Sequence, residues 1–343
     1  MINKKKIYAK KLWTDLKNYY LNSLEDPWYL ILAEVENLIN IYTMEFYKTK
    51  NIKSLYLPIT TGSISSPIGL GSDSSPIKIE ICGIETYLAD SMQFMLEYGC
   101  RLFNDGCYYV MPSFRGENAD ERHLCQFFHS EAEIPGKLDD VIELVEEYVQ
   151  YLASKLLDSA AEKILLINGD NTYIENFIKQ KRPFERIMMK DAIKLLEQDT
   201  NDCIDIHPVG FKMINKLGEK KLIEMFGGYV WVTHFDQLAV PFYQCLDVND
   251  PTKALNADLL MGIGEIVGCG ERHASVREVK EALKLHNVDY TEYEWYCTMK
   301  EKYPMKTSGF GLGIERFILW LFKHDDIRDC QILPRFNGIN ITP

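Results

Sequence analysis

The segment from residue 113 to residue 134, SFRGENADERHLCQFFHSEAEI, constrains the fold of this chain more than any other stretch. Two runs of strand-forming residues enclose a short charged turn, which predicts a β-hairpin. The hairpin would present Arg115 and Glu117 on one side and His123 with Phe127 on the other. A guanidinium binds phosphate, a carboxylate accepts from an adenine amino group, and an aromatic ring stacks on a base. The segment therefore predicts an ATP site, with a solvated charged hairpin as the alternative.

A second segment, SGFGLGIERFILWL, places alternating glycines before the start of a predicted helix near the C-terminus. Glycine lets a ligand approach the backbone closely, and Arg316 at the helix start would meet the terminal phosphates. Taken alone, such a glycine run is equally typical of close packing between a helix and a strand. Its pairing with the hairpin predicts that Arg115 and Arg316 act on one triphosphate.

A third segment, ADLLMGIGE, supplies two carboxylates, Asp258 and Glu265, with glycines between them. Carboxylates on neighbouring strands or loops can hold Mg²⁺ between phosphate oxygens. Arg272 follows in GCGERHAS, where a buried guanidinium would pair with a substrate carboxylate or carboxamide. The alternative is that the two acidic residues lie on the surface with unrelated roles.

The rest of the chain reads as one mixed domain without internal repeats. Periodicity predicts a helix over residues 11–50, and an extended segment over 51–61 follows it. Residues 62–76 are rich in Gly, Ser and Pro, which predicts a loop long enough to act as a lid. Further predicted helices lie near 91–103, 138–157, 172–180, 189–197 and 275–286, and further predicted strands are IKIEICGI, CYYVMPSF, LCQFFHSEAEI, YVWVTHF and PFYQCLDV.

Composition narrows the class of protein. The formal net charge is −12, which disfavours general binding to a phosphate backbone, although a local basic patch is compatible with it. Nine scattered cysteines without a C-x-x-C pair indicate reduced thiols rather than a disulfide framework or a zinc cluster. No run of about 18 apolar residues and no signal-peptide pattern occurs, so we expect a soluble, cytoplasmic protein that does not bind membranes.

In this order, the three segments resemble the motifs of class II aminoacyl-tRNA synthetases, closest to the asparaginyl and aspartyl branch. Pro58 stands where that family's first motif has its dimer-interface proline. Arg115, Glu117 and His123 match the second motif, FRxE followed by RHL, and Arg316 matches the third, GFGLGxER. The resemblance implies an ATP-dependent enzyme and a homodimer.

The resemblance also implies a fold and a domain division. The fold would be α+β, with a mixed, mostly antiparallel sheet flanked by helices. Residues 1–27 would form an N-terminal helical extension, and residues 28–343 the catalytic domain. Asp258 and Glu265 fall on the family's Mg²⁺-binding carboxylates, and Arg272 on the arginine that holds the side-chain end of the amino acid.

Several positions depart from the family's pattern. The family's lid loop has a Glu that holds the substrate α-ammonium, and Ser66 stands there, so a charge-assisted hydrogen bond of about 1.5–3 kcal/mol would be missing. Gln93 keeps the family's substrate-binding Gln, whereas Leu96 replaces a Lys of the aspartyl enzymes and Gln126 a Glu. Only residues 1–27 stand where the family has its anticodon-reading barrel, which with the negative charge predicts that tRNA is an unlikely partner.

These features predict an AMP-forming amide ligase akin to asparagine synthetase A. Its substrates would be an amino acid such as aspartate, or a related carboxylate, and ammonia or a small amine. Arg115 would neutralise the α-phosphate, while His123 and Arg316 would hold the pyrophosphate. His129 and Glu131 would contact the substrate or orient the amine, unless they are satisfied sheet residues.

Two other hypotheses stay open. The first is transfer of the activated acyl group to tRNA or to a carrier protein. The second is a non-catalytic ligand sensor, which the joint presence of the phosphate-binding and metal-binding residues opposes.

Overall fold

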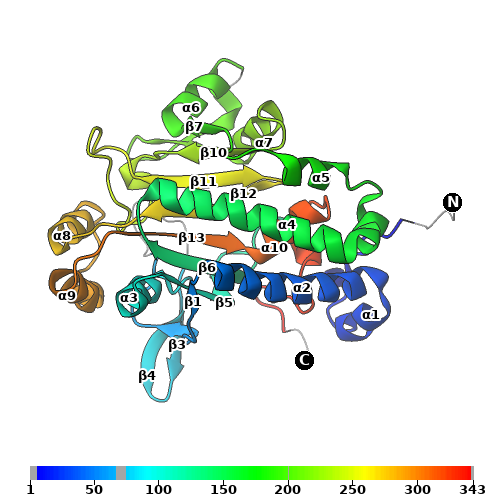
Figure 1. The fold of residues 1–343 in the computed structure, drawn as a ribbon. Helices are drawn as coiled ribbons and strands as arrows, with labels where there is room; N and C mark the ends of the chain where they lie inside the picture. The colour runs from blue at the N-terminus through cyan, green and yellow to red at the C-terminus, as the bar shows by residue number, and fades with distance from the viewer. Residues whose placement is uncertain (1–5, 67–74, 200, 341–343) are drawn as a thin grey trace.

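A mixed, mostly antiparallel sheet of eight strands forms the centre of the molecule, as expected (Figure 1). The computed structural model describes residues 6–66, 75–199 and 201–340. The strand order is β1-β5-β6-β13-β12-β11-β10-β7, and only the two edge pairs, β1 with β5 and β10 with β7, are parallel. The strands are β1 (Lys53–Ser54), β5 (Cys107–Phe114), β6 (Gln126–Pro135), β7 (Arg186–Met188), β10 (Tyr229–Thr233), β11 (Asn256–Met261), β12 (Gly264–Glu271) and β13 (Thr307–Gly313).

Helices cover one face of this sheet. The long helices α2 (Pro27–Thr49) and α4 (Leu138–Asn168) run side by side across it (Figure 1). Asp26 caps α2 by accepting from the Trp28 amide, and Pro27 fits the first turn because its missing N–H has no helical partner there. The same core cluster includes residues of α1 (Tyr19–Glu25), α5 (Thr172–Lys179) and α10 (Ile314–Leu321).

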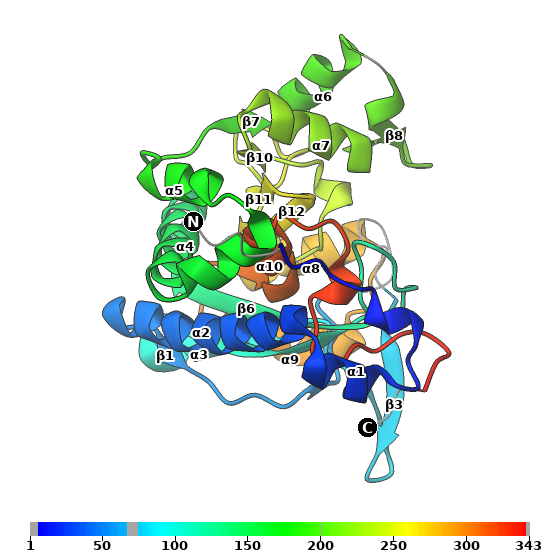
Figure 2. The same cartoon turned by 90° about the vertical axis from the view of Figure 1, so that its right-hand side faces the viewer.

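Smaller elements surround the other parts of the sheet. A lobe beside β7 and β10 contains α6 (Met189–Glu197), α7 (Lys216–Met225) and the short pair β8 (Ile204–Ile206) and β9 (Lys212–Ile214) (Figure 2). A three-stranded sheet, made of β2 (Thr60–Thr61), β3 (Ile77–Ile81) and β4 (Ile84–Leu88), projects from the opposite end (Figure 1). The remaining helices are α3 (Gln93–Phe103), α8 (Val276–Leu285) and α9 (Glu294–Lys302).

The structure corrects three sequence expectations. The predicted helix over 11–50 is a short 3-10 turn followed by α1 and α2, because the chain breaks at Asp26 to cap the second helix. The helix predicted for 138–157 continues to Asn168 and ends at Gly169, whose positive φ stops it. The predicted strand over residues 241–248 is a loop that forms two isolated bridges, Gln244 with Arg272 and Leu246 with Ala254.

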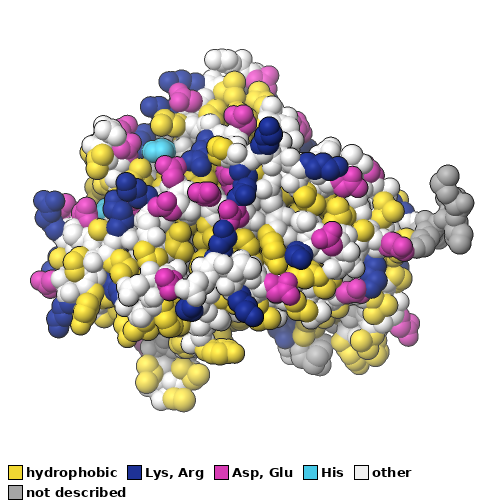
Figure 3. Space-filling view, viewed as in Figure 1, with side chains coloured by type: hydrophobic (Ala, Val, Ile, Leu, Met, Phe, Trp, Pro, Cys, Tyr) yellow, Lys and Arg dark blue, Asp and Glu magenta, His cyan; other side chains and the backbone are white. Residues whose placement is uncertain are grey.

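The cysteines and the charged surface residues are distributed as follows. All nine cysteines are free thiols. On the face formed by α2 and α4, Lys and Arg side chains are intermixed with Asp and Glu side chains (Figure 3). Within the described residues, no helix combines the length and the apolar character that a membrane crossing requires.

Candidate active site

Two neighbouring cavities lie on the sheet face that points away from α2 and α4. The first has a volume of about 300 Å³ and the second about 180 Å³. Arg115, His129, Glu265 and Gly311 line both, so the cavities are continuous. The two faces of the sheet differ because side chains alternate along a strand. On β6, Ser130 points to the helices and bonds Tyr148, while its neighbours line the cavities.

Glycines on β13 make room for the functional side chains of β6. His129, Glu131 and Glu133 pair with Gly313, Gly311 and Gly309, respectively, across the antiparallel ladder. A side chain at Gly309 would collide with the Glu133 carboxylate, and a Cβ at Gly311 would lie 3.1 Å from Glu131 Oε1. The alternating glycines noted in the sequence therefore leave space for these side chains, and Gly311 itself lines both cavities.

Arg272, on the loop after β12, is buried at one wall of the first cavity. Its Nε donates to both carboxylate oxygens of Glu133 at 3.1 and 3.2 Å, and its Nη2 donates to Glu133 Oε2 at 3.1 Å. Nη1 donates to Gln244 Oε1 at 3.1 Å. Burial raises the pKa of Glu133 to about 7, although Arg272 opposes that shift. The site thus presents an arginine whose charge is largely matched by its own protein partner.

Glu131 is buried, and both of its carboxylate oxygens have protein partners. Its Oε2 accepts from the Ser91 hydroxyl at 2.6 Å and from the Tyr109 hydroxyl, and its Oε1 lies 3.0 Å from His129 Nδ1. Burial opposes ionisation, but His129 and these donors lower the pKa of the carboxyl. Both residues line the first cavity, and the network also fits the alternative of satisfied sheet residues.

Asp258 on β11 and Glu265 on β12 converge above Gly268. A Cβ at Gly268 would lie 3.0 Å from Glu265 Oε1 and 3.5 Å from Asp258 Oδ1. Burial, together with the charges of Glu265 and Glu219, raises the pKa of Asp258 well above its ordinary value. A divalent cation would relieve this repulsion, and Mg²⁺ is commonly held by one or two carboxylates plus substrate phosphates. The two residues therefore fit Mg²⁺, although the described residues contain no complete protein cage of three or more ligands.

Arg115 and Arg316 face the second cavity from two different elements. Arg115 follows β5, its guanidinium lies 5.5 Å from the centre of the Phe127 ring, and its buried Nε has no hydrogen-bond partner within the described residues. Arg316, in the first turn of α10, donates to the Glu265 backbone carbonyl at 2.8 Å. Two guanidinium groups with spare donors beside an aromatic ring suit a nucleotide triphosphate.

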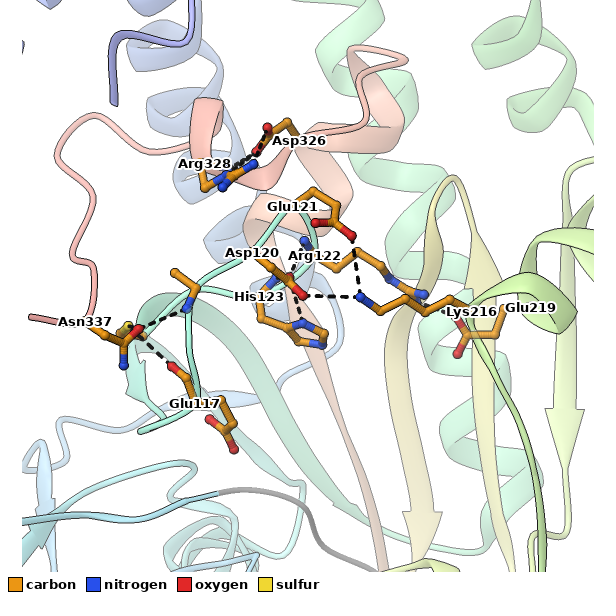
Figure 4. A network of polar contacts seen from close by, with 12 residues as sticks. Glu117, Asp120, Glu121, Arg122, His123, Lys216, Glu219, Asp326, Arg328 and Asn337 are labelled. Atoms are coloured by element: carbon orange, nitrogen blue, oxygen red, sulfur yellow. Dashed lines mark hydrogen bonds and ion pairs between the residues drawn. The ribbon is translucent and has the colours of Figure 1, made fainter. Parts of the chain in front are cut away.

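The hairpin turn carries a polar network that orients His123 (Figure 4). His123 Nδ1 lies 2.9 Å from Asp120 Oδ1, which also accepts from the Arg122 amide, and Lys216 of α7 binds the other oxygen of Asp120. Against the effect of burial, the Arg122 amide, His123 and Lys216 lower the pKa of Asp120 to about 2. Burial lowers the pKa of His123. Since Asp120 holds Nδ1, the other ring nitrogen of His123 is available to a ligand.

Glu117 and Ser66 connect the cavities to the predicted lid. Ser75, at the far end of that loop, donates its amide to Glu117 Oε1 at 2.7 Å, so one oxygen of Glu117 already has a protein partner. At the near end, the Ser66 amide donates to Asp90 at 2.8 Å, and Ser66 lines the first cavity. The middle of the loop, residues 67–74, lies outside the described residues.

All twelve predicted site residues line one of the two cavities. The first holds Ser66, Gln93, Asp258 and Arg272 together with Glu131, and the second holds Glu117, His123, Phe127 and Arg316, while Arg115, His129 and Glu265 line both. Their roles remain predictions.

Sequence reasoning missed Asp90, Glu133, Gln244 and the pair Arg122–Glu219. Glu133 had a signal, because it lies two residues beyond Glu131 on a predicted strand and so shares its face. Gln244 had none, since the segment around it was taken for a strand.

The sequence matches the family described as tRNA synthetases class II (D, K and N) over residues 14–337. It is 32% identical over 257 residues to the asparagine–tRNA ligase of Pyrococcus abyssi, covering 73% of this chain and 56% of that protein. It is 31% identical over 269 residues to the probable cytoplasmic asparagine–tRNA ligase of Schizosaccharomyces pombe, covering 76% and 45%. The chain thus spans about half the length of the curated relatives it matches.

Solved structures agree with these relatives. Asparaginyl-tRNA synthetase from Pyrococcus horikoshii, complexed with asparaginyl-adenylate, superimposes with a TM-score of 0.86 at 26% identity. The match covers 95% of this chain and 73% of that one.

The prediction that tRNA is an unlikely partner is wrong. It depended on the short stretch before residue 28 and on the net charge, and neither outweighs relatives that are named as tRNA ligases. Those names also favour the hypothesis of transfer to tRNA over that of ligation to ammonia. The matched residues include all three motifs and both cavities, and the chain therefore belongs to the class II tRNA synthetases of the D, K and N group.

Proposed function

We propose that this chain is the catalytic part of an ATP-dependent, AMP-forming ligase that activates asparagine and transfers it to tRNA. The observation that carries the proposal is the convergence of Arg115, Arg316, Asp258 and Glu265, from four different elements, on two continuous cavities. The adenylate bound to the Pyrococcus horikoshii enzyme supports the use of ATP. The relative named as cytoplasmic supports the same compartment for this protein.

In the first step, a carboxylate oxygen of the amino acid attacks the α-phosphorus of ATP. The bond from that phosphorus to the bridging oxygen breaks, and pyrophosphate leaves. Arg115 would bind the α-phosphate, where its unpaired Nε can donate, and Phe127 would stack on the adenine. Arg316 and the free ring nitrogen of His123 would hold the leaving pyrophosphate. Mg²⁺, held by Asp258 and Glu265, would neutralise phosphate charge.

In the second step, a ribose hydroxyl of tRNA attacks the acyl carbonyl. The bond from the carbonyl carbon to the phosphate oxygen breaks, AMP leaves, and the hydroxyl proton goes to solvent or to the departing phosphate. No side chain needs to act as a covalent nucleophile. Positioning and charge stabilisation by the residues above account for the chemistry.

The Arg272–Glu133 pair supports a carboxamide rather than a second carboxylate at the side-chain end. A guanidinium has five N–H donors, of which three bind Glu133 and Gln244 here. The remaining two can donate to a carboxamide oxygen, while Glu133 can accept from its nitrogen. A substrate carboxylate would instead face the charge of Glu133 at close range.

The test measures amino-acid-dependent exchange of labelled pyrophosphate into ATP, followed by transfer of labelled asparagine to total tRNA. We expect exchange with asparagine and acid-precipitable label on tRNA. If the protein with Mg²⁺ supports no exchange with any amino acid, the proposal fails, and the ligand-sensor hypothesis gains support. Formation of asparagine from aspartate and ammonia, without label on tRNA, would favour the amide-ligase hypothesis.

A further inference from the structure

The first cavity contains an excess of negative charge. Five carboxylates line it, Asp90, Glu131, Glu133, Asp258 and Glu265, against two guanidinium groups. Three of the carboxylates lie beside a basic side chain: Glu133 binds Arg272, Glu131 lies beside His129, and Glu265 lies 3.5 Å from Arg316. Within the described part of the chain, Asp90 and Asp258 have no such partner. Asp258 lies beside Glu265 and fits a metal, which leaves Asp90 to meet a cation from the substrate.

Asp90 is buried, with 4% of its surface exposed, in the turn between β4 and α3. Its Oδ1 accepts from the Ser65 amide at 3.0 Å, and its Oδ2 accepts from the Ser65 hydroxyl at 2.9 Å and the Ser66 amide at 2.8 Å. These donors are neutral, so they orient the carboxylate without cancelling its charge. Each carboxylate oxygen has two lone pairs, so Oδ1 can accept one further hydrogen bond.

A second acceptor belongs to Gln93, which lines the same cavity. Gln93 is 5% exposed, and its Nε2 donates to Glu97 Oε1 at 3.1 Å. Since a carboxylate only accepts, Glu97 fixes the amide nitrogen of Gln93 on its side. The opposite atom, Oε1, is buried and lacks a hydrogen-bond partner within the described residues. A buried acceptor left without a donor is destabilising, so this atom too is suited to a donor from the substrate.

The backbone places Asp90 beside the phosphate end of the site. The Phe114 amide donates to the Ala89 carbonyl at 2.9 Å, and Arg115 directly follows Phe114. In an amino acid, the ammonium and the reacting carboxylate are attached to the same carbon. An ammonium site must therefore lie close to the arginine that binds the α-phosphate, as Asp90 does.

We propose that Asp90 determines specificity by binding the α-ammonium of the amino acid, with Gln93 Oε1 as the second acceptor. The Asp90 carboxylate would do what the lid Glu does in the family, which Ser66 cannot do because it has no carboxylate. The inference rests on the proposed amino-acid activation. It adds that the ammonium is bound by the turn before α3 rather than by the predicted lid.

The test compares asparagine with succinamic acid, which is asparagine with its amine replaced by hydrogen. In pyrophosphate exchange, we expect Asp90→Asn to raise the KM for asparagine by about 10- to 100-fold, because a charge-assisted hydrogen bond is lost. The KM for ATP should change less than about twofold, since the phosphate-binding groups stay in place. The inhibition constant of succinamic acid should stay nearly constant, so discrimination between the two ligands falls.

Controls separate charge from structure. Asp105→Asn changes an exposed residue that lines neither cavity and should leave all constants unchanged, and Asp90→Glu should restore part of the discrimination. If Asp90→Asn does not fold by circular dichroism, Asp90→Ser repeats the test with a smaller neutral side chain. A variant that weakens both ligands equally would show that Asp90 only shapes the cavity through Ser65 and Ser66, and would overturn the inference. Absence of exchange in the wild-type protein would instead contradict the proposed function.

Discussion

The guanidinium of Arg122, in the hairpin turn, forms an ion pair with the carboxylate of Glu219 on α7 (Figure 4). The two side chains are only 12% and 20% exposed, and Arg122 lines the second cavity. Burial raises the pKa of Glu219, and Arg122 opposes that shift. The pair joins the lobe of α6 and α7 to the predicted nucleotide site, so the lobe contributes to the position of the hairpin.

Replacing Glu219 with Gln should weaken this connection. The change removes the charged partner of a mostly buried guanidinium, and we expect the free energy of unfolding to fall by about 1–3 kcal/mol in urea titrations. Lys216→Ala is the matched control, because that side chain is 53% exposed and pairs with Asp120 and Glu121 at the surface. The Lys216→Ala change should lower the free energy of unfolding by less than about 1 kcal/mol. Equal effects of the two variants would contradict a special role for the Arg122 pair.

Replacing Arg115 with Ala should strongly reduce the rate of adenylation without unfolding the protein. The guanidinium has no ion-pair partner within the described residues and stacks on Phe127, so its loss leaves no unpaired charge behind. Removing one preorganised group that stabilises developing charge typically lowers the rate by about 10²–10³-fold. Pyrophosphate exchange measures the loss, and Arg277→Ala, an exposed change on α8, is the control. Normal exchange in Arg115→Ala would remove the phosphate assignment.

Much of this site could be predicted because its residues sit on regular strands. Period-two alternation places His129 and Glu131 on one face of β6, and the glycines of β13 mark the space opposite them. The motif order then indicated which distant segments meet. The helices α3, α5, α6 and α8 were placed within a few residues because their apolar periodicity is strong, whereas α7 and α9 were not predicted.

The remainder depends on tertiary contacts that leave no local pattern. The segment 241–248 has strand-forming residues, yet it forms only isolated bridges, one of which brings Gln244 to Arg272. The pairing of Arg122 with Glu219 joins residues whose neighbours in sequence give no indication of contact. Asp90 was not predicted as a site residue because its role depends on which other carboxylates of the cavity already have partners.

Replacing Asp258 with Asn should reduce the stabilisation of the protein by Mg²⁺ and ATP. The pKa of Asp258 is raised by burial and by nearby carboxylates, so its ionised form costs free energy until a cation arrives. Without nucleotide, the variant should melt no lower than wild type. With Mg²⁺ and ATP, the wild-type melting temperature should rise and that of the variant should rise less, because ligand binding stabilises the native state by mass action. Chelation with EDTA should abolish the wild-type shift, and an EDTA-resistant shift would contradict the metal assignment.

Replacing Glu315 with Gln should flatten the dependence of stability on pH. Glu315 is buried beside Arg316, where it accepts from the Phe128 amide and from Gln331 Nε2. Burial raises its pKa from 4.5 to about 7. The native state therefore holds a proton that the unfolded state has released, and stability falls as pH rises from about 4.5 to 7. In urea titrations at several pH values, the free energy of unfolding of the variant should fall less with rising pH than that of the wild type. The difference should be at most about 3 kcal/mol. An unchanged slope would contradict this origin.

The segment around Pro58 should form a dimer interface. Pro58 lies between Tyr56 and Ile59 in the sequence, and the single chain leaves Tyr56 103% and Ile59 45% exposed. Large apolar side chains gathered at one exposed place indicate a surface that another protein covers. Light scattering should give twice the mass of one chain, and Tyr56→Arg combined with Ile59→Arg should shift the protein toward the monomer. Val248→Arg is the control, because Val248 is 88% exposed on a different loop. A wild-type monomer would contradict the prediction. A variant that stays dimeric would place the interface elsewhere.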